Sequence, residues 1–174
     1  MGTEEFGRLS DGRTVRKYIL KNGGGLTAEF LDYGCRIARL FVPGRDGVPA
    51  NIVLGHDSAA EYEPPGDFLG AVIGRYANRI AGAEFCAGGK THRLEKSEGN
   101  NTLHSGASGF QHRLWDFSSS GGGDAPFVTF SLVSPNGDGG FPGNLRLGVT
   151  YTLTPDNALR IDYRAETDAE TPLN

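Results

Sequence analysis

The sequence contains few of the residues that mark metal-binding, disulfide-rich or nucleic-acid-binding proteins. Only two of its 174 residues are cysteines, Cys35 and Cys86. Their spacing fits neither a disulfide framework nor a metal site, so we expect two isolated, buried thiols and no metal or other cofactor. The net charge is −4 and no basic stripe runs along the chain, which argues against nucleic acid as a partner.

Long apolar segments are also missing. No stretch approaches the roughly 20 apolar residues that a membrane-spanning helix needs. The first residues are polar and lack the basic start and apolar run of a secretory signal. We therefore expect no membrane partner and a cytoplasmic location. We also expect residues 1–13 to be loosely ordered.

Glycine and alternating apolar residues are abundant instead. The chain has 27 glycines, where average usage of about 7% gives roughly a dozen. Apolar and polar residues alternate with a period of two over much of the chain, which is typical of strands with one buried face. The pattern predicts strands at residues 14–20, 26–31, 37–42, 84–87, 90–94, 127–133, 145–153 and 159–165. The last two form a hairpin around a turn at residues 154–157.

Signals for helices are scarce. Residues 58–61 fit a capping box, but prolines follow at once, so we expect a single helical turn there. The segment 118–124 is rich in serine and glycine and is interpreted as a loop. The fold class is therefore all-β, an antiparallel β-sandwich in one domain over residues 1–174, although periodicity alone does not separate a sandwich from a barrel.

Three stretches do not follow this strand-and-turn logic. They are GRYANRI at 74–80, NTLHSG at 101–106 with a later Gly109, Phe110 and Trp115, and SPNGDGGFPGNL at 134–145. In this order and at these separations they resemble the aldose 1-epimerase (galactose mutarotase) family, and the likeness runs from about residue 14 to the end. The resemblance implies a galactose mutarotase-like supersandwich, of which this chain is the N-terminal, truncated portion.

The resemblance also implies a sugar site in a cleft on one sheet. Asn78 and Arg79 match positions that bind the sugar, and His104 matches a histidine that lines the site and plays a supporting role in catalysis. The chain departs from the family pattern at Ser105, where the family has glycine, and at Asn136 and Gly139, where it has acidic residues. These changes affect loop chemistry more than the sugar contacts.

The family interconverts the α and β anomers of free hexoses such as galactose and glucose. A base takes the proton of the anomeric hydroxyl while an acid protonates the ring oxygen, so the ring opens and closes again. In the family the principal acid is a histidine and the base a glutamate, and both are expected beyond residue 174. We therefore expect little activity from the chain alone, and self-association through unpaired sheet edges.

Each candidate also has an ordinary structural interpretation. From the bare sequence Arg79 fits a solvated or ion-paired residue, His104 a structural histidine and Asn78 a turn former, and only the resemblance favours a site. Trp115 is interpreted as a core residue rather than a ring that stacks on sugar. Two alternative functions stay open: a non-catalytic carbohydrate-binding module, and a relative that acts on hexose 6-phosphates, which requires additional basic residues near the site.

Overall fold

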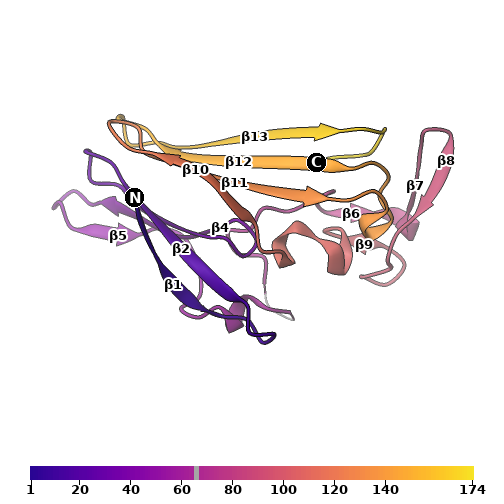
Figure 1. Cartoon of the computed structure of the whole chain (residues 1–174). Coiled ribbons are helices and arrows are strands. Elements are labelled where there is room, and N and C mark those ends of the chain that lie inside the picture. Colours follow the sequence, from indigo (N-terminus) through magenta and orange to yellow (C-terminus); the bar gives the residue numbers. More distant parts are fainter. Residues whose placement is uncertain (65–66) are drawn as a thin grey trace.

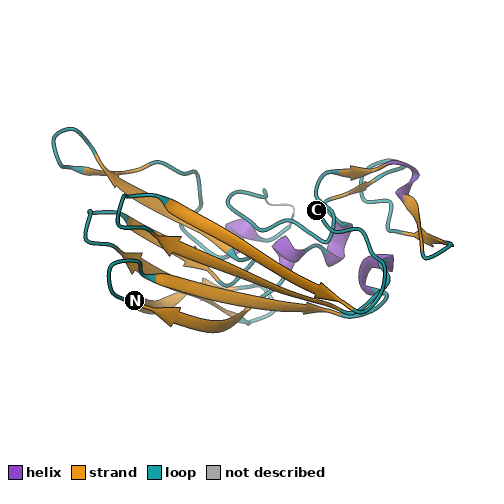
Figure 2. Ribbon diagram, turned by 90° about the horizontal axis from the view of Figure 1, so that it is seen from above, coloured by secondary structure: helices purple, strands orange, loops and turns teal. Residues whose placement is uncertain are grey.

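The computed structural model describes residues 1–64 and 67–174. They form two main antiparallel sheets and two short two-stranded ones, joined by single turns of 3₁₀ helix (Figures 1 and 2). The strands are β1 (Gly2–Arg8), β2 (Thr14–Lys21), β3 (Thr27–Leu31), β4 (Arg36–Pro43), β5 (Pro49–Asn51), β6 (Arg79–Ile80), β7 (Glu84–Ala87), β8 (Lys90–Arg93), β9 (Thr102–Leu103), β10 (Asp116–Gly121), β11 (Phe127–Ser134), β12 (Leu145–Leu153) and β13 (Leu159–Thr167). The 3₁₀ turns are η1 (Ala60–Tyr62), η2 (Ala81–Ala83), η3 (Gly106–Ser108), η4 (Phe110–His112) and η5 (Asp138–Gly140).

The two large sheets lie one above the other as the layers of a sandwich. One has the strand order β1-β2-β3-β4-β5 and the other β10-β11-β12-β13, so each is a meander of sequential strands. Figure 1 shows the five-stranded sheet below and the four-stranded sheet above, with the β7–β8 hairpin projecting beyond one end. The small β6–β9 pair lies at that same end.

Most of the predicted elements are confirmed. The hairpin predicted at 145–165 is the β12–β13 pair, which runs in unbroken register from Leu145 opposite Thr167 to Leu153 opposite Leu159. The strands predicted at 84–87 and 90–94 form the β7–β8 hairpin, and Gly88 and Gly89 between them both have positive φ. The single helical turn is η1, where both the backbone N–H and the hydroxyl of Ser58 donate to Glu61, at 3.1 and 2.7 Å.

Three expectations are wrong. Residues 1–13 are not loosely ordered throughout, because Gly2–Arg8 forms β1 and pairs with β2, where Lys17 also reaches Glu4 at 2.7 Å. The segment 118–124 is not simply a loop, because β10 extends to Gly121. Its three consecutive serines pair with β11 even though they lack apolar bulk. Cys35 is buried as expected, but Cys86 is exposed because it lies on the β7–β8 hairpin, outside the sandwich.

Aromatic rings from both sheets fill the space between them. Phe30 of β3 stacks on Tyr151 of β12 with centroids 4.4 Å apart, and Tyr18 of β2 meets the edge of Phe130 of β11 at 5.0 Å. The buried Tyr151 hydroxyl donates to the Cys35 carbonyl at 2.6 Å, so its polar end is also satisfied. These contacts fix how the two sheets lie against each other.

The face of β13 that continues the core-facing side of β12 is less covered than its sequence implies. Ile161 and Tyr163 lie on the apolar side of its alternating pattern, yet they are 37% and 61% exposed. Within the described part of the chain, β13 pairs with β12 alone, and β1 pairs with β2 alone. Self-association through such edges stays a prediction. Among the described residues, no helix has the length and apolar character needed to cross a bilayer.

Asp32 is a buried carboxylate whose ionisation opposes folding. It is 7% exposed and accepts a hydrogen bond from the Arg16 backbone N–H at 2.9 Å. Burial raises the pKa of Asp32 to about 6. The folded protein therefore holds this proton more tightly than the unfolded chain does, so this group's contribution to stability is full below about pH 4 and is lost as the pH rises through 6.

We expect Asp32→Asn to raise the free energy of unfolding at pH 7 by about 1–3 kcal/mol, because the amide keeps the acceptor oxygen without the buried charge. The gain should shrink toward zero at pH 4, where the wild-type carboxyl is protonated. Urea unfolding at both pH values measures this. The exposed Asp124→Asn is the matched control, and an equal gain from Asp32→Asn at both pH values would contradict the assignment to ionisation.

Candidate functional site

The three stretches that depart from strand logic meet at one end of the sandwich. Within the first, the carbonyl of Gly74 accepts the N–H of Phe110 at 3.1 Å. The N–H of Tyr76 donates to the hydroxyl of Ser105 at 2.9 Å. Strands β6 and β9 then join the first stretch to the second through backbone pairing. Segments about 30 residues apart in the sequence are thus held side by side.

Asn78 and His104 bind each other by two hydrogen bonds. The Asn78 N–H donates to Nδ1 of His104, and the His104 N–H donates to the Asn78 carbonyl, both at 3.0 Å. Both residues have left-handed backbone, with φ of 64° and 50°. Non-glycine residues adopt this conformation at a cost, and such strain gathers at functional sites. The paired backbone is therefore a physical reason to place a site here.

The hydrogen bond to Asn78 fixes the state of the His104 ring. Because Nδ1 accepts a hydrogen bond from the Asn78 N–H, the neutral ring carries its proton on Nε2. Partial burial and, next, the positive charge of Arg79 lower the pKa of His104, while Glu98 acts in the opposite direction. Phe68 meets the ring edge-to-face at 4.8 Å. At neutral pH His104 therefore presents a neutral Nε2–H donor in a held orientation.

Arg79 is held by a carboxylate. Glu98 accepts from Nε and Nη2 of Arg79 at 2.5 and 2.6 Å, and Nη1 of Arg79 donates to the side-chain oxygen of Asn78 at 3.2 Å. The hydrogen bonds from Arg79 lower the pKa of Glu98, which therefore stays ionised. A guanidinium has five N–H groups, and three are used here, which leaves two for a ligand.

The third stretch supports the first through Arg75, a buried residue at 2% exposure. Its guanidinium donates to the carbonyls of Ser134, Pro135, Pro142 and Gly143 at 2.7 to 2.9 Å. Its Nε also reaches the Ser134 hydroxyl at 3.0 Å. One side chain thus fastens both ends of the loop at 134–143 to the segment that carries Asn78 and Arg79.

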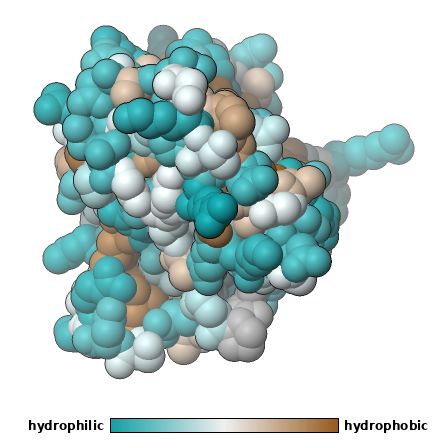
Figure 3. Space-filling view, turned by 90° about the vertical axis from the view of Figure 1, so that its right-hand side faces the viewer, coloured by the Kyte–Doolittle hydropathy of each residue, from teal (hydrophilic) through white to brown (hydrophobic). Residues whose placement is uncertain are grey.

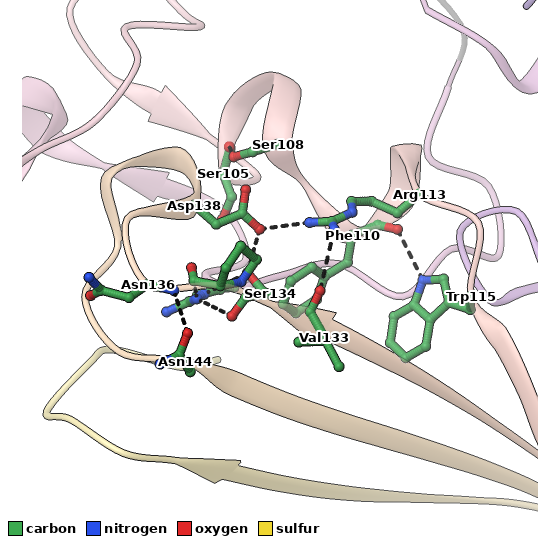
Figure 4. A network of polar contacts seen from close by, with 12 residues as sticks. Ser105, Ser108, Phe110, Arg113, Trp115, Val133, Ser134, Asn136, Asp138 and Asn144 are labelled. Carbon is green, nitrogen blue, oxygen red and sulfur yellow. Dashed lines mark hydrogen bonds and ion pairs between the residues drawn. The ribbon is translucent and has the colours of Figure 1, made fainter.

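A carboxylate completes this support. The Ser134 hydroxyl donates to Asp138 at 2.5 Å, and Asp138 also pairs with Arg113 at 2.6 Å (Figure 4). The positive charge of Arg75 is therefore opposed by Asp138 through one intervening hydroxyl. Burial lowers the pKa of Arg75 and Asp138 acts against that shift, so the network keeps the guanidinium charged.

Ser105 illustrates what the family's glycine does at this position. Its φ is 63°, between the left-handed His104 and Gly106, so the backbone here favours a residue without a Cβ. The serine contributes two hydrogen bonds, because its buried hydroxyl accepts from the Tyr76 N–H and donates to the Tyr76 carbonyl at 3.3 Å. Serine at this position therefore adds a side-chain contact between the two stretches.

A cavity of about 520 Å³ lies beside this cluster. Arg79 belongs to both, whereas Asn78 and His104 do not line the cavity. The other lining residues include Tyr76, Phe85, Cys86 and the segment 170–172. Figure 3 views this end of the molecule, where mainly hydrophilic residues surround smaller hydrophobic areas. We base the site on the Asn78–His104–Arg79 cluster, because its donors and acceptors have fixed directions, and treat the cavity as adjoining space.

The structure brings together the three residues singled out from the sequence. Asn78 touches both Arg79 and His104, so the three side chains adjoin one another, and their role in binding a sugar stays a prediction. Sequence reasoning missed Glu98 and Arg75. Glu98 could have been noticed, since it lies three residues before the second stretch, whereas nothing in the sequence sets Arg75 apart as buried. No three His, Cys, Asp or Glu side chains within residues 1–64 and 67–174 are placed to hold a metal ion.

Known proteins resemble this chain over nearly its whole length. The sequence profile of the family described as aldose 1-epimerase matches residues 16–174. The aldose 1-epimerase of Escherichia coli K12 is 40% identical over 164 residues, which are 94% of this chain and 46% of that protein. The galactose mutarotase of Sus scrofa is 39% identical over 97% of this chain and 48% of its own length.

Solved structures show the same likeness. The galactose 1-epimerase of Lactobacillus acidophilus NCFM superposes with a TM-score of 0.84 at 29% identity, over 98% of this chain and 49% of that one. The fold is therefore an all-β, antiparallel sandwich of the galactose mutarotase-like class, as predicted. The chain belongs to the aldose 1-epimerase family. It spans about half the length of the curated relatives that it matches.

Proposed function

We propose that this chain supplies the sugar-gripping part of an aldose 1-epimerase, an isomerase that interconverts the α and β anomers of free hexoses such as galactose and glucose. The observation that supports this most directly is the mutual fixing of Asn78, Arg79 and His104. Together they offer amide, guanidinium and imidazole groups on one surface, which suits the hydroxyls and ring oxygen of a pyranose.

The chemistry of these three residues assigns them to binding rather than to proton transfer. Mutarotation removes the proton of O1 and adds one to O5, so that the C1–O5 bond breaks, the C1–C2 bond rotates and the ring closes again. Arg79 keeps its proton at ordinary pH, and Asn78 does not titrate. His104 holds its Nε2 proton as a neutral ring, so it serves as a hydrogen-bond donor to a sugar oxygen. The principal acid and base are therefore other groups of the enzyme.

The alternative of a hexose 6-phosphate substrate gains no support from the site. Phosphate recognition calls for uncompensated positive charge. Arg79 is paired with Glu98 through two hydrogen bonds, so the pair adds no net charge. A neutral hexose fits this arrangement better.

Two substitutions of His104 test the roles of its two ring nitrogens separately. In His104→Asn the amide oxygen lies near the position of Nδ1, so the hydrogen bond from Asn78 is kept and the Nε2 donor is lost; asparagine also tolerates left-handed backbone. We expect an unchanged fold and about threefold to tenfold weaker galactose binding, because one donor to a sugar oxygen is missing. His104→Gln keeps a donor near Nε2 but loses the acceptor for Asn78.

Titration of the purified 174-residue chain with galactose, followed by NMR chemical shifts or calorimetry, measures both variants. His92→Asn, on the β7–β8 hairpin, is the matched control and should bind as the wild type does. Failure of the wild-type chain to bind galactose would refute the proposal. So would a His104→Asn variant that binds galactose as tightly as the wild type.

A further inference from the structure

Glu98 is the one feature of the site that the binding of a sugar by Asn78, Arg79 and His104 does not explain. It belongs to none of the three motif stretches, yet it makes the shortest contacts in the cluster, at 2.5 and 2.6 Å to Arg79. The two side chains are 39% and 52% exposed. At this degree of exposure a surface ion pair adds little to stability, so a structural role is a weak explanation for it.

The backbone holds Glu98 in place toward Arg79. Its N–H donates to the Asn101 carbonyl at 3.0 Å and its carbonyl accepts the Asn101 N–H at 2.9 Å. Gly99, with φ of 58°, closes this tight turn. The side chain of Asn101 in turn accepts the N–H of Gly82 at 3.2 Å. The carboxylate is therefore presented by an anchored turn next to β9 and β6.

The charges that act on His104 come from this pair. Arg79 and Glu98 are the charged groups that act on His104, with opposite effects on its pKa. Glu98 is likewise the charged partner that raises the pKa of Arg79. With Glu98 ionised and His104 neutral, the cluster carries no net charge at pH 7. The guanidinium of Arg79 alone would attract a negatively charged ligand. The adjacent carboxylate of Glu98 repels such a ligand and offsets that attraction.

We propose that Glu98 is a specificity-determining residue, which cancels the charge of Arg79 so that the site accepts neutral pyranoses and disfavours sugar acids and sugar phosphates. This inference rests on the proposed sugar-binding function and deepens it. Galactose and galacturonate are suitable probes, since galacturonate differs in having a carboxylate at C6. The repulsion acts over roughly the Debye length, about 10 Å at 0.1 M salt, so it does not depend on one particular sugar orientation.

Glu98→Gln removes the charge and keeps an acceptor oxygen for Arg79. We expect the ratio of galacturonate to galactose affinity in the 174-residue chain to rise about threefold to tenfold at low ionic strength, and the rise to diminish in 0.5 M salt. The double variant Arg79→Gln/Glu98→Gln restores neutrality and should return the ratio toward the wild-type value. Calorimetric or NMR titration gives both dissociation constants.

Glu166→Gln is the matched control. It removes the same charge from an exposed pair with Arg164 on β13, at 2.7 Å, and should leave the ratio unchanged. A chain that binds galactose but shows the same ratio in Glu98→Gln and Glu166→Gln overturns this inference and leaves the proposed function standing. A wild-type chain that does not bind galactose at all overturns both.

Discussion

Replacement of Arg75 by methionine should lower the free energy of unfolding by about 3–5 kcal/mol, in the range seen when a buried charged network loses one partner. Methionine fills similar space but donates no hydrogen bond. The carbonyls of Ser134, Pro135, Pro142 and Gly143 then lose their shared donor inside the protein, and unsatisfied buried polar groups cost about 1–3 kcal/mol each. Urea unfolding followed by circular dichroism measures the loss.

Two further variants test the cause. Arg75→Lys keeps the charge but cannot reproduce the planar fork, so it should recover less than half of the loss. Arg160→Met removes an exposed arginine that pairs with Asp162 on β13 and should change stability by less than about 0.5 kcal/mol. A loss below about 1 kcal/mol for Arg75→Met would show that the loop at 134–143 is held by other contacts.

Truncation of Trp115 to alanine should also cost about 3–5 kcal/mol. The indole is 3% exposed, its Nε1–H donates to the Phe110 carbonyl at 3.2 Å, and its ring meets Phe110 edge-on with centroids 6.0 Å apart. Alanine leaves a cavity and removes one of the two donors to the Phe110 carbonyl, which keeps the N–H of Arg113 at 3.3 Å. Trp115→Phe keeps most of the volume and should lose only about 1–2 kcal/mol, which denaturant unfolding resolves from the alanine value.

Fluorescence of the same residue separates a core role from a sugar-stacking role. Trp115 is the single tryptophan of the chain, so intrinsic fluorescence reports on it alone. A buried indole should keep its emission when galactose is added at saturating concentration. Strong quenching or a spectral shift, together with little loss of stability in Trp115→Ala, would place the ring in the sugar site and contradict its assignment to the core.

The fold could be predicted largely from local pattern. The β12–β13 hairpin follows from strict alternation of apolar and polar residues and from a turn rich in Pro, Asp and Asn. Alternation indicates a strand because one face of the strand packs on the core and the other faces solvent. The failures have the same origin. Strand β10 consists mainly of serine and glycine, and its pairing with β11 comes from its neighbour rather than from its own composition. Likewise β1 is polar, and only its ladder to β2 orders it.

The site was predictable to a smaller extent. Asn78, Arg79 and His104 could be chosen because their motifs resemble a family, but no periodicity indicates that they touch. Their contact depends on left-handed backbone at two non-glycine residues and on β6 pairing with β9 across more than 20 residues. Arg75 lies in the first motif stretch, but nothing in its sequence context indicates that its side chain is buried. Its guanidinium is buried because four backbone carbonyls of the loop at 134–143 accept its hydrogen bonds in the folded protein. Hydrogen bonds between residues this far apart in the chain produce no pattern in the local sequence.

The reciprocal hydrogen bonds between Asn78 and His104 have a consequence for how this surface distinguishes ligands. Both residues already occupy fixed positions before a ligand arrives, so association needs little ordering of the backbone, and pre-organisation of this kind favours tight binding. A rigid receptor does not adapt to a misplaced hydroxyl. Hexoses that differ only in the axial or equatorial direction of one hydroxyl should therefore be told apart by lost contacts rather than by rearrangement of the protein.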